Sequence, residues 1–198
     1  MTGLGNPHEL SINTIKSRFD QTLPHALPTN VPAAAVLILL IEKQNIEVVF
    51  TQRSAFVRNH KNEVAFPGGA YEKADTTLYR TALRETCEEI SVCSSAVQFI
   101  GSLDPFTTHY NLEIFPYIAS IDEKTFLSAR PDEEVTAIFS IPLRWLMEHR
   151  NWEFRNYRSE NTVREVIFYQ PYNGYTVWGM TAGILQNFIE VIKNRSVF

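Results

Sequence analysis

The sequence predicts an α/β fold, and two kinds of pattern support this. Short runs of aliphatic and aromatic residues, bounded by turn-forming residues, indicate β-strands. A helix in the middle of the chain, and apolar residues at helical spacing near its C-terminus, indicate helices that pack on the resulting sheet. At 198 residues the chain is most simply one main domain, which is large enough to bury most of its apolar surface.

The expected elements follow one another along the chain. Residues 1–30 form a preamble in which 11–23 could be a short helix that the next prolines end, and the main domain takes 31–198. Within that domain we expect strands over 33–41, 46–52, 96–103, 112–121, 135–141 and within 152–175, and helices through 84–90 and over 143–149 and 180–193.

Composition excludes several classes of protein. The formal net charge of −4, without a block of Lys or Arg, argues against a nucleic-acid partner and favours a small-molecule or protein partner. We expect no signal peptide, and the longest apolar run, 31–41, is too short to span a bilayer. Cys87 and Cys93 are expected to be reduced thiols of a cytoplasmic protein. A homodimer is left open.

The acidic helix is the most informative stretch. Glu85, Glu88 and Glu89 are spaced three and four residues apart, so they share one helix face as like charges, near the negative end of the helix dipole. The opposite face is expected to be the buried one, which leaves the carboxylates exposed as oxygen ligands for a cation such as Mg²⁺. An ordinary solvated acidic face is the alternative. The residues of the expected buried face are Tyr79, Ala82, Leu83, Cys87 and Ile90.

A pair of glycines upstream favours the metal-binding interpretation. Gly68 and Gly69 allow backbone N–H groups to approach a phosphate closely, and Asp75, Thr76 or Thr77 can cap the helix that follows. A phosphate-binding loop next to a metal-binding helix indicates chemistry on a pyrophosphate.

These residues resemble the Nudix box, which reads Gly, five residues, Glu, seven residues, then Arg-Glu-U-x-Glu-Glu-x-Gly-U, with U aliphatic. Here Gly69 is followed by Asp75 at the position of the first Glu, and residues 84–92 supply the rest. The sequence departs from the pattern at Asp75, in a gap to Arg84 that is one residue longer, and at Thr86 and Ser91.

Two further segments are similar to the coenzyme A pyrophosphatase branch of that family. The signature of that branch reads L-L-T-x-R-S, three residues, R, three residues, G, three residues, F-P-G-G. This chain follows it with residues 49–54, Arg58 and residues 66–69, but Asn62 stands where the Gly before F-P-G-G is expected. Residues 177–184 resemble its W-G-x-T-A segment. The three matches occur in the order that the branch has them.

The resemblance implies a Nudix fold, a mixed β-sheet sandwiched between helices, and a set of site residues. Glu85, Glu88 and Glu89 would bind Mg²⁺ or Mn²⁺, while Arg84 orients the carboxylates. Glu134 or a helix glutamate would be the base, although Glu134 on its own is more typical of a solvated turn. The residues implied to contact substrate phosphates are Arg53, Arg58, Gly68 and Gly69, with surface solubility as the alternative role of the two arginines.

The implied reaction is hydrolysis of the diphosphate bond of coenzyme A or acyl-coenzyme A, to 3′,5′-ADP and (acyl-)phosphopantetheine. A Nudix enzyme for another nucleoside diphosphate derivative, such as ADP-ribose or a dinucleotide, is the alternative. A non-catalytic nucleotide-binding Nudix protein is a third hypothesis, but such proteins usually lose carboxylates that are retained here.

Overall fold

The computed structural model describes residues 10–20, 32–55, 62–108, 111–159 and 162–194. Most of the predicted preamble lies outside these ranges. Its described part contains helix α1 (Ile12–Lys16), which is shorter than expected and is capped by the Ser11 side chain. The predicted phosphate contact Arg58 also lies outside the described residues.

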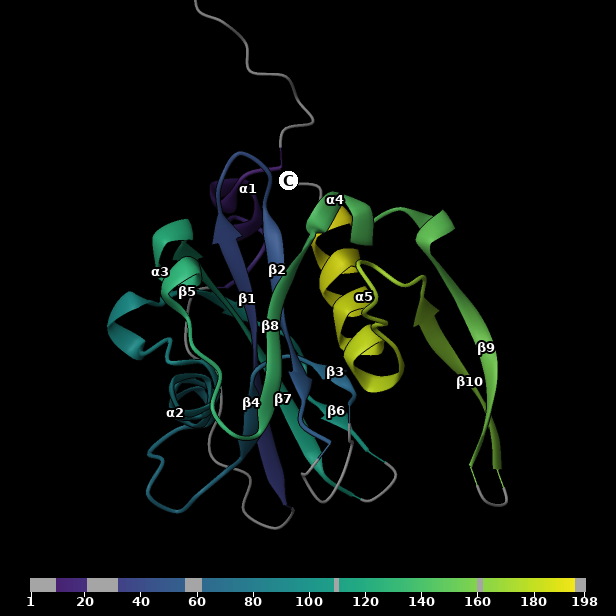
Figure 1. Cartoon of the computed structure of the whole chain (residues 1–198), viewed down its shortest axis with the longest axis horizontal. Coiled ribbons are helices and arrows are strands. Elements are labelled where there is room, and N and C mark those ends of the chain that lie inside the picture. The colour runs from purple at the N-terminus through teal and green to yellow at the C-terminus, as the bar shows by residue number, and fades with distance from the viewer. Residues whose placement is uncertain (1–9, 21–31, 56–61, 109–110, 160–161, 195–198) are drawn as a thin grey trace, which may run out of the picture.

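One sheet forms the centre of the molecule (Figure 1). Among the described residues it contains eight strands, in the order β3-β2-β1-β7-β5, with β4 paired to β1, β6 to β7 and β8 to β2. Strands β1 and β7 are parallel along ten residue pairs, whereas the other pairs are antiparallel, so the sheet is mixed. The strands are β1 (Ala33–Glu42), β2 (Glu47–Arg53), β3 (Val64–Ala65), β4 (Gly68–Ala70), β5 (Gln98–Ser102), β6 (Phe106–Thr107), β7 (Glu113–Asp122) and β8 (Val135–Pro142).

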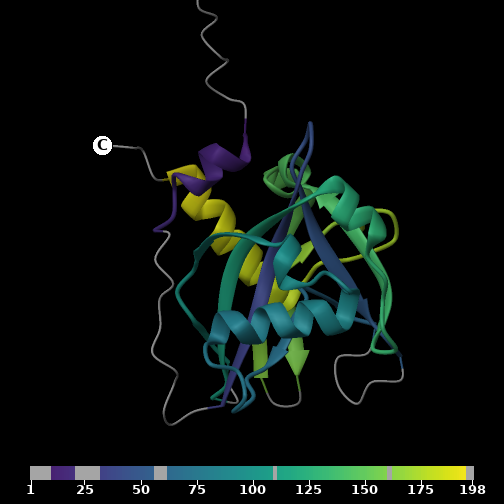
Figure 2. The ribbon, with the colours of Figure 1, turned by 90° about the vertical axis from the view of Figure 1, so that its left-hand side faces the viewer.

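Both faces of this sheet are buried, because helices cover each of them. Along β1, Leu37 and Leu39 face the cluster that contains residues of α2 (Leu78–Ile90), whereas Ile38 and Leu40 face the cluster that contains residues of α5 (Gly179–Asn194). Figures 1 and 2 show the two helices on opposite sides of the sheet. This alternation explains the nearly continuous apolar run of β1, since side chains of both parities are buried. The predicted mixed sheet between helices is confirmed.

The remaining elements differ more from expectation. The hairpin of β9 (Trp152–Ser159) and β10 (Thr162–Tyr169) forms a separate two-stranded sheet that stands away from the centre (Figure 1). Strand structure ends at Tyr169, before the predicted limit of 175. The predicted helix over 143–149 is the single turn α4 (Leu143–Leu146) followed by a 3₁₀ turn (His149–Asn151). Helix α3 (Glu123–Ser128), which the Asp122 side chain caps, was not predicted.

Helix α2 begins where the sequence indicated, because the Thr77 hydroxyl accepts a hydrogen bond from the Arg80 N–H. It ends at Ser91, which has a left-handed backbone conformation. Its buried residues include the predicted Ala82, Leu83 and Ile90, but Tyr79 and Cys87 are only half-buried. In the described residues no helix combines the length and apolarity needed to cross a membrane.

The two cysteines form a disulfide, so the prediction of reduced thiols was wrong. The Cα atoms of Cys87 and Cys93 lie 4.4 Å apart. The sequence argument placed Cys87 on the buried face of the helix and for that reason interpreted the pair as reduced thiols. Instead, the left-handed turn at Ser91 brings the chain back beside the last turn of α2, where Cys87 lies at the edge of the core.

We therefore expect the purified, unreduced protein to show no titratable thiol after denaturation, and two thiols after treatment with a reductant. Because the disulfide closes a short loop at the end of α2, reduction should lower the free energy of unfolding by about 2 kcal/mol. Thiol titration and urea unfolding with and without reductant would measure both effects. Two free thiols in protein that was purified without reductant would contradict the disulfide.

Candidate active site

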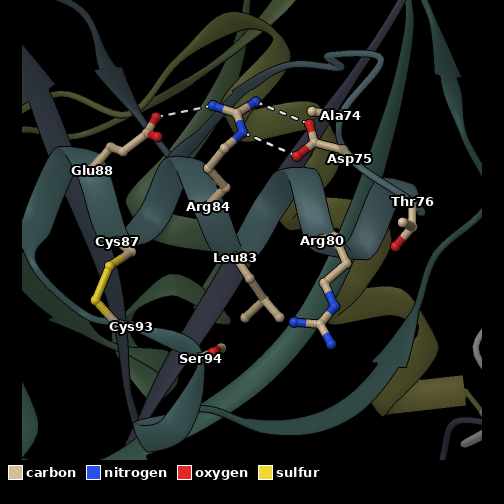
Figure 3. A pocket seen from close by; sticks show the side chains of 10 residues that line it. All are labelled: Ala74, Asp75, Thr76, Arg80, Leu83, Arg84, Cys87, Glu88, Cys93 and Ser94. Carbon is tan, nitrogen blue, oxygen red and sulfur yellow. Dashed lines mark hydrogen bonds and ion pairs between the residues drawn. A yellow bond between two sulfur atoms is a disulfide. The ribbon is translucent and has the colours of Figure 1, made fainter.

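Arg84 is at the centre of a polar network on α2. Its guanidinium donates to both carboxylate oxygens of Asp75, each at 3.0 Å, and to the Ala70 carbonyl at 3.1 Å. On its other side Nη1 lies 2.9 Å from Glu85 Oε1 and 2.9 Å from Glu88 Oε2. Figure 3 shows the guanidinium between Asp75 and Glu88. Arg84 thus contacts two of the three predicted metal-binding carboxylates and has the geometry to orient them.

Asp75, in the loop before α2, anchors this arginine. Its buried carboxylate also accepts hydrogen bonds from the Thr81 hydroxyl at 2.9 Å and from the Glu72 N–H at 3.1 Å. The hydrogen bonds from Arg84 are the main reason that the pKa of Asp75 lies below its usual value, and they raise the pKa of Arg84 in turn. Asp75, at the box position where Glu is expected, is therefore an ionised anchor for Arg84.

Glu89 is buried, which contradicts the expectation that all three carboxylates project into solvent. Its Oε2 accepts a hydrogen bond of 3.1 Å from the Gly68 N–H, and the residue is 6% exposed. Strand β4 packs against this face of α2, so solvent reaches Glu88 freely but reaches Glu89 hardly at all. Burial raises the pKa of Glu89 to about 8, and the negative charges of Glu85 and Asp132 act in the same direction.

The two glycines allow the carboxylates to approach the backbone this closely. A Cβ atom on Gly69 would lie 2.5 Å from the Glu85 carboxylate. A Cβ on Gly68, whose φ is +147°, would lie 2.3 Å from the Ala35 carbonyl oxygen. The Gly68 N–H donates to Glu89 in this structure, and the predicted contact of both glycines with a phosphate stays a prediction.

Arg53 and Glu134 lie on the other side of Glu89. Arg53 ends β2, and Glu134 directly precedes β8, which pairs with β2. The Arg53 guanidinium lies 3.3 Å from Glu134 Oε2 through Nη2 and 3.6 Å from Glu89 Oε1 through Nη1. The Glu134 backbone is held by its N–H donating to Asp132 Oδ1 at 2.9 Å and by its carbonyl accepting from the Ser54 N–H at 2.7 Å.

The site residues fit a divalent cation that shares its ligands with a substrate. Within the described part of the chain, no three acidic, His or Cys side chains converge as in an all-protein metal site. Mg²⁺, however, is usually bound by one or two carboxylates together with water and substrate phosphates. Glu85 and Glu89 lie against the consecutive glycines Gly69 and Gly68. Because Glu89 is buried, its ionised form costs free energy unless a cation lies nearby. Both are suited to that kind of site.

A pocket of about 560 Å³ opens on the outer side of α2 (Figure 3). It is lined by Arg84 and Glu88 but not by Glu85, Glu89, Arg53 or Glu134, so only part of the predicted site borders this pocket. Sequence reasoning missed Arg80 and the disulfide, which line the pocket, and Asp132, which supports Glu134. The position of Asp132 two residues before Glu134 was the one available signal for it.

Comparison with known proteins identifies relatives of this chain. A family model described as "NUDIX domain" matches residues 30–161. The "Uncharacterized Nudix hydrolase NudL" of Klebsiella pneumoniae (strain 342) is 36% identical over 193 residues, covering 95% of this chain and 98% of that protein. The protein of the same name from Escherichia coli O7:K1 is 36% identical over 180 residues, covering 89% and 92%.

The fold also resembles solved structures. The crystal structure of a MutT/nudix family protein from Enterococcus faecalis superposes with a TM-score of 0.55 at 18% identity, covering 87% of this chain and 66% of that one. At this level of identity the likeness concerns the fold alone.

Glu89 should make the stability of the cation-free protein depend on pH. Its folded pKa of about 8 exceeds the ordinary value of 4.5, so the folded state binds this proton more tightly, and the resulting stability is lost as pH rises through 8. We expect the free energy of unfolding in chelator to fall between pH 5 and 9 by on the order of 3 kcal/mol. Glu89→Gln should largely remove this slope, and exposed Glu88→Gln should retain it. Urea unfolding across this pH range would show it, and an unchanged slope in Glu89→Gln would contradict the assignment.

The two glycines should respond differently to substitution by Ala. In Gly68→Ala the added Cβ meets rigid backbone in a left-handed conformation, so we expect a loss of about 3 kcal/mol in stability. In Gly69→Ala the Cβ meets the carboxylate end of the Glu85 side chain rather than backbone, and rotation of that side chain should relieve the contact at a smaller cost in stability than in Gly68→Ala. Displaced Glu85 should then weaken Mn²⁺ binding roughly tenfold. Thermal unfolding and titration calorimetry would separate the two effects. Equal destabilisation by both substitutions would disprove this distinction.

Proposed function

The chain belongs to the Nudix domain family, and on that premise we propose that it hydrolyses the diphosphate bond of coenzyme A or its acyl thioesters. The products would be 3′,5′-ADP and (acyl-)phosphopantetheine. Water adds across one P–O–P linkage: a new P–O bond forms to the water oxygen, the bridging oxygen leaves with the other phosphate, and the two products share the water protons.

One observation supports the choice of coenzyme A: residues 49–54 and 66–69 of the branch signature and the distant segment 177–184 are neighbours in space. Thr51 pairs with Ala65, directly before the F-P-G-G run, and the Phe50 and Phe66 rings stack at 5.1 Å. In the third segment, the Thr181 hydroxyl donates to the Val64 carbonyl at 3.1 Å. The segments therefore converge at β3, the strand that leads into the F-P-G-G run, as residues that together form one substrate site would.

The carboxylates of Glu85 and Glu89 would hold the divalent cation, Mg²⁺ or Mn²⁺, whereas Glu88, the third predicted ligand, pairs with Arg84 in this structure. When bound, the cation offsets charge on the diphosphate and lowers the pKa of a coordinated water. Arg84 contributes by keeping Glu85 and Glu88 in one orientation, because its own position is set by Asp75 and Ala70. The Gly68 N–H fixes the orientation of the Glu89 carboxylate by donating a hydrogen bond to it.

Glu134 is our choice for the group that accepts the proton of the attacking water. Its carboxylate is 59% exposed, and its backbone is held by Asp132 and Ser54, so it combines access to water with a defined position. It approaches Glu89 through their common partner Arg53. A helix glutamate remains the alternative base.

The phosphates of the substrate need cations, and Arg53 is the described candidate. It lies beside the carboxylates and can grip a phosphate with two N–H groups. Arg58, which the resemblance also implies, lies outside the described residues. Gly68 and Gly69 would border the same diphosphate.

A product assay tests the proposal. Purified protein with coenzyme A and Mg²⁺ should release 3′,5′-ADP and phosphopantetheine, detected by chromatography and mass spectrometry. Glu89→Gln should lower kcat by roughly 10²- to 10³-fold, since a cation contributes several kcal/mol to the transition state. Reaction in H₂¹⁸O would identify which phosphorus is attacked.

Arg150→Gln is a suitable control, because Arg150 is exposed and pairs only with Glu148 among the contacts described for it. It should keep full activity. Turnover of ADP-ribose or a dinucleotide in place of coenzyme A would support diphosphate hydrolysis but refute coenzyme A as the substrate. Binding of coenzyme A without product under all conditions would instead indicate a nucleotide-binding protein.

A further inference from the structure

A single guanidinium links two carboxylates of the site. Arg53 Nη1 faces Glu89 Oε1 at 3.6 Å, and Nη2 donates to Glu134 Oε2 at 3.3 Å. Glu89 carries the predicted metal-binding role, and Glu134 the predicted role of base. The same cation therefore restrains both groups on which the proposed reaction depends.

The two oxygens of Glu89 are in different environments. Oε2 is held by the Gly68 N–H at 3.1 Å, so the backbone fixes this side of the carboxylate. Oε1 points toward Arg53. Since Glu85 and Asp132 add negative charge around a side chain that is only 8% exposed, the location calls for a positive charge, and Arg53 supplies it. A divalent cation on Oε1 would have to replace this guanidinium.

The contacts of Arg53 are loose in comparison with those of Arg84. Arg84 donates to both Asp75 oxygens at 3.0 Å and lies 2.9 Å from Glu85 and from Glu88, the range of strong charge-assisted bonds. The Arg53 contacts of 3.3 and 3.6 Å are longer, and one of them is to an exposed carboxylate. Less free energy therefore opposes a change of rotamer in Arg53 than in Arg84.

We propose that Arg53 is a positioning residue that takes the place of the divalent cation at Glu89, leaves when the cation binds, and then faces the substrate diphosphate. This inference rests on the cation site of the proposed function. Departure of the guanidinium also frees Glu134 Oε2, the oxygen that it contacts, to accept a proton. Cation binding, base release and delivery of a phosphate-binding group are thus coupled through one side chain.

Competition between Arg53 and the cation predicts the direction in which Mn²⁺ affinity changes when Arg53 is replaced. In Arg53→Gln the competitor is absent, so Mn²⁺ should bind the substrate-free protein about three- to fivefold more tightly, the range expected for a partly exposed ion pair. With substrate the same variant should show a KM raised at least tenfold, because the phosphate contact is lost. Arg53→Lys keeps the positive charge but not the two parallel N–H groups of the guanidinium. This variant should have a KM close to that of the wild type and a similar Mn²⁺ affinity.

The experiment uses the whole chain, with Mn²⁺ affinity from titration calorimetry and from electron paramagnetic resonance of free Mn²⁺. Arg150→Gln, which removes the same charge from a different part of the surface, should leave affinity and KM unchanged. Weaker or unchanged Mn²⁺ binding in folded Arg53→Gln would overturn the inference, since a purely structural arginine predicts that result. Failure of the wild type and every variant to bind Mn²⁺ would overturn the cation site itself. Mn²⁺ binding without turnover of coenzyme A would refute the substrate only.

Discussion

The burial of Glu89 against the Gly68 N–H is the interaction on which the rest of the site depends. A carboxylate can be this deep only if its oxygens find donors, and the glycine pair that begins β4 supplies one of them. Gly68 is required because any Cβ would collide with the Ala35 carbonyl, and Gly69 because a Cβ would occupy the position of Glu85. The glycines of β4 and the carboxylates of the acidic helix therefore depend on each other: the glycines leave room for the carboxylates and supply a donor to one of them.

The mixed sheet determines where this unit lies. Strand β1 pairs with β4 on one side of its first half and runs parallel to β7 along ten residue pairs. Strand β2, antiparallel to both β1 and β8, brings its last residue, Arg53, next to Val135 at the start of β8. Arg53 and Glu134 thus come to the same end of the sheet as the glycines, although they are 81 residues apart in sequence. Topology, rather than local sequence, assembles the two sides of the site.

This difference explains which features could be predicted from the sequence. The apolar runs of β1, β2 and β7, the Thr77 cap and the helical spacing of α5 are local signals, and the structure agrees with them to within a few residues. Helix α3 also had a local signal in its Asp122 cap, which the sequence argument overlooked. The burial of Glu89 had none, because nothing within α2 indicates that β4 covers its acidic face. The disulfide likewise depends on the left-handed turn at Ser91, which is unusual for a residue other than glycine.

The two arginines of the site illustrate how equal charges acquire different roles. Arg84 is surrounded by acceptors on both sides, and Asp75, buried and ionised, would be left a costly unpaired anion if the guanidinium moved. Among the contacts between described residues, Arg53 would leave behind an exposed Glu134, which water can solvate, and a Glu89 that either a proton or a metal ion can neutralise. The free energy that holds each arginine in place thus depends on the cost of leaving its partner carboxylates without a cation. By that criterion Arg84 belongs to the fixed frame of the helix, and Arg53 is the cation that the site can exchange.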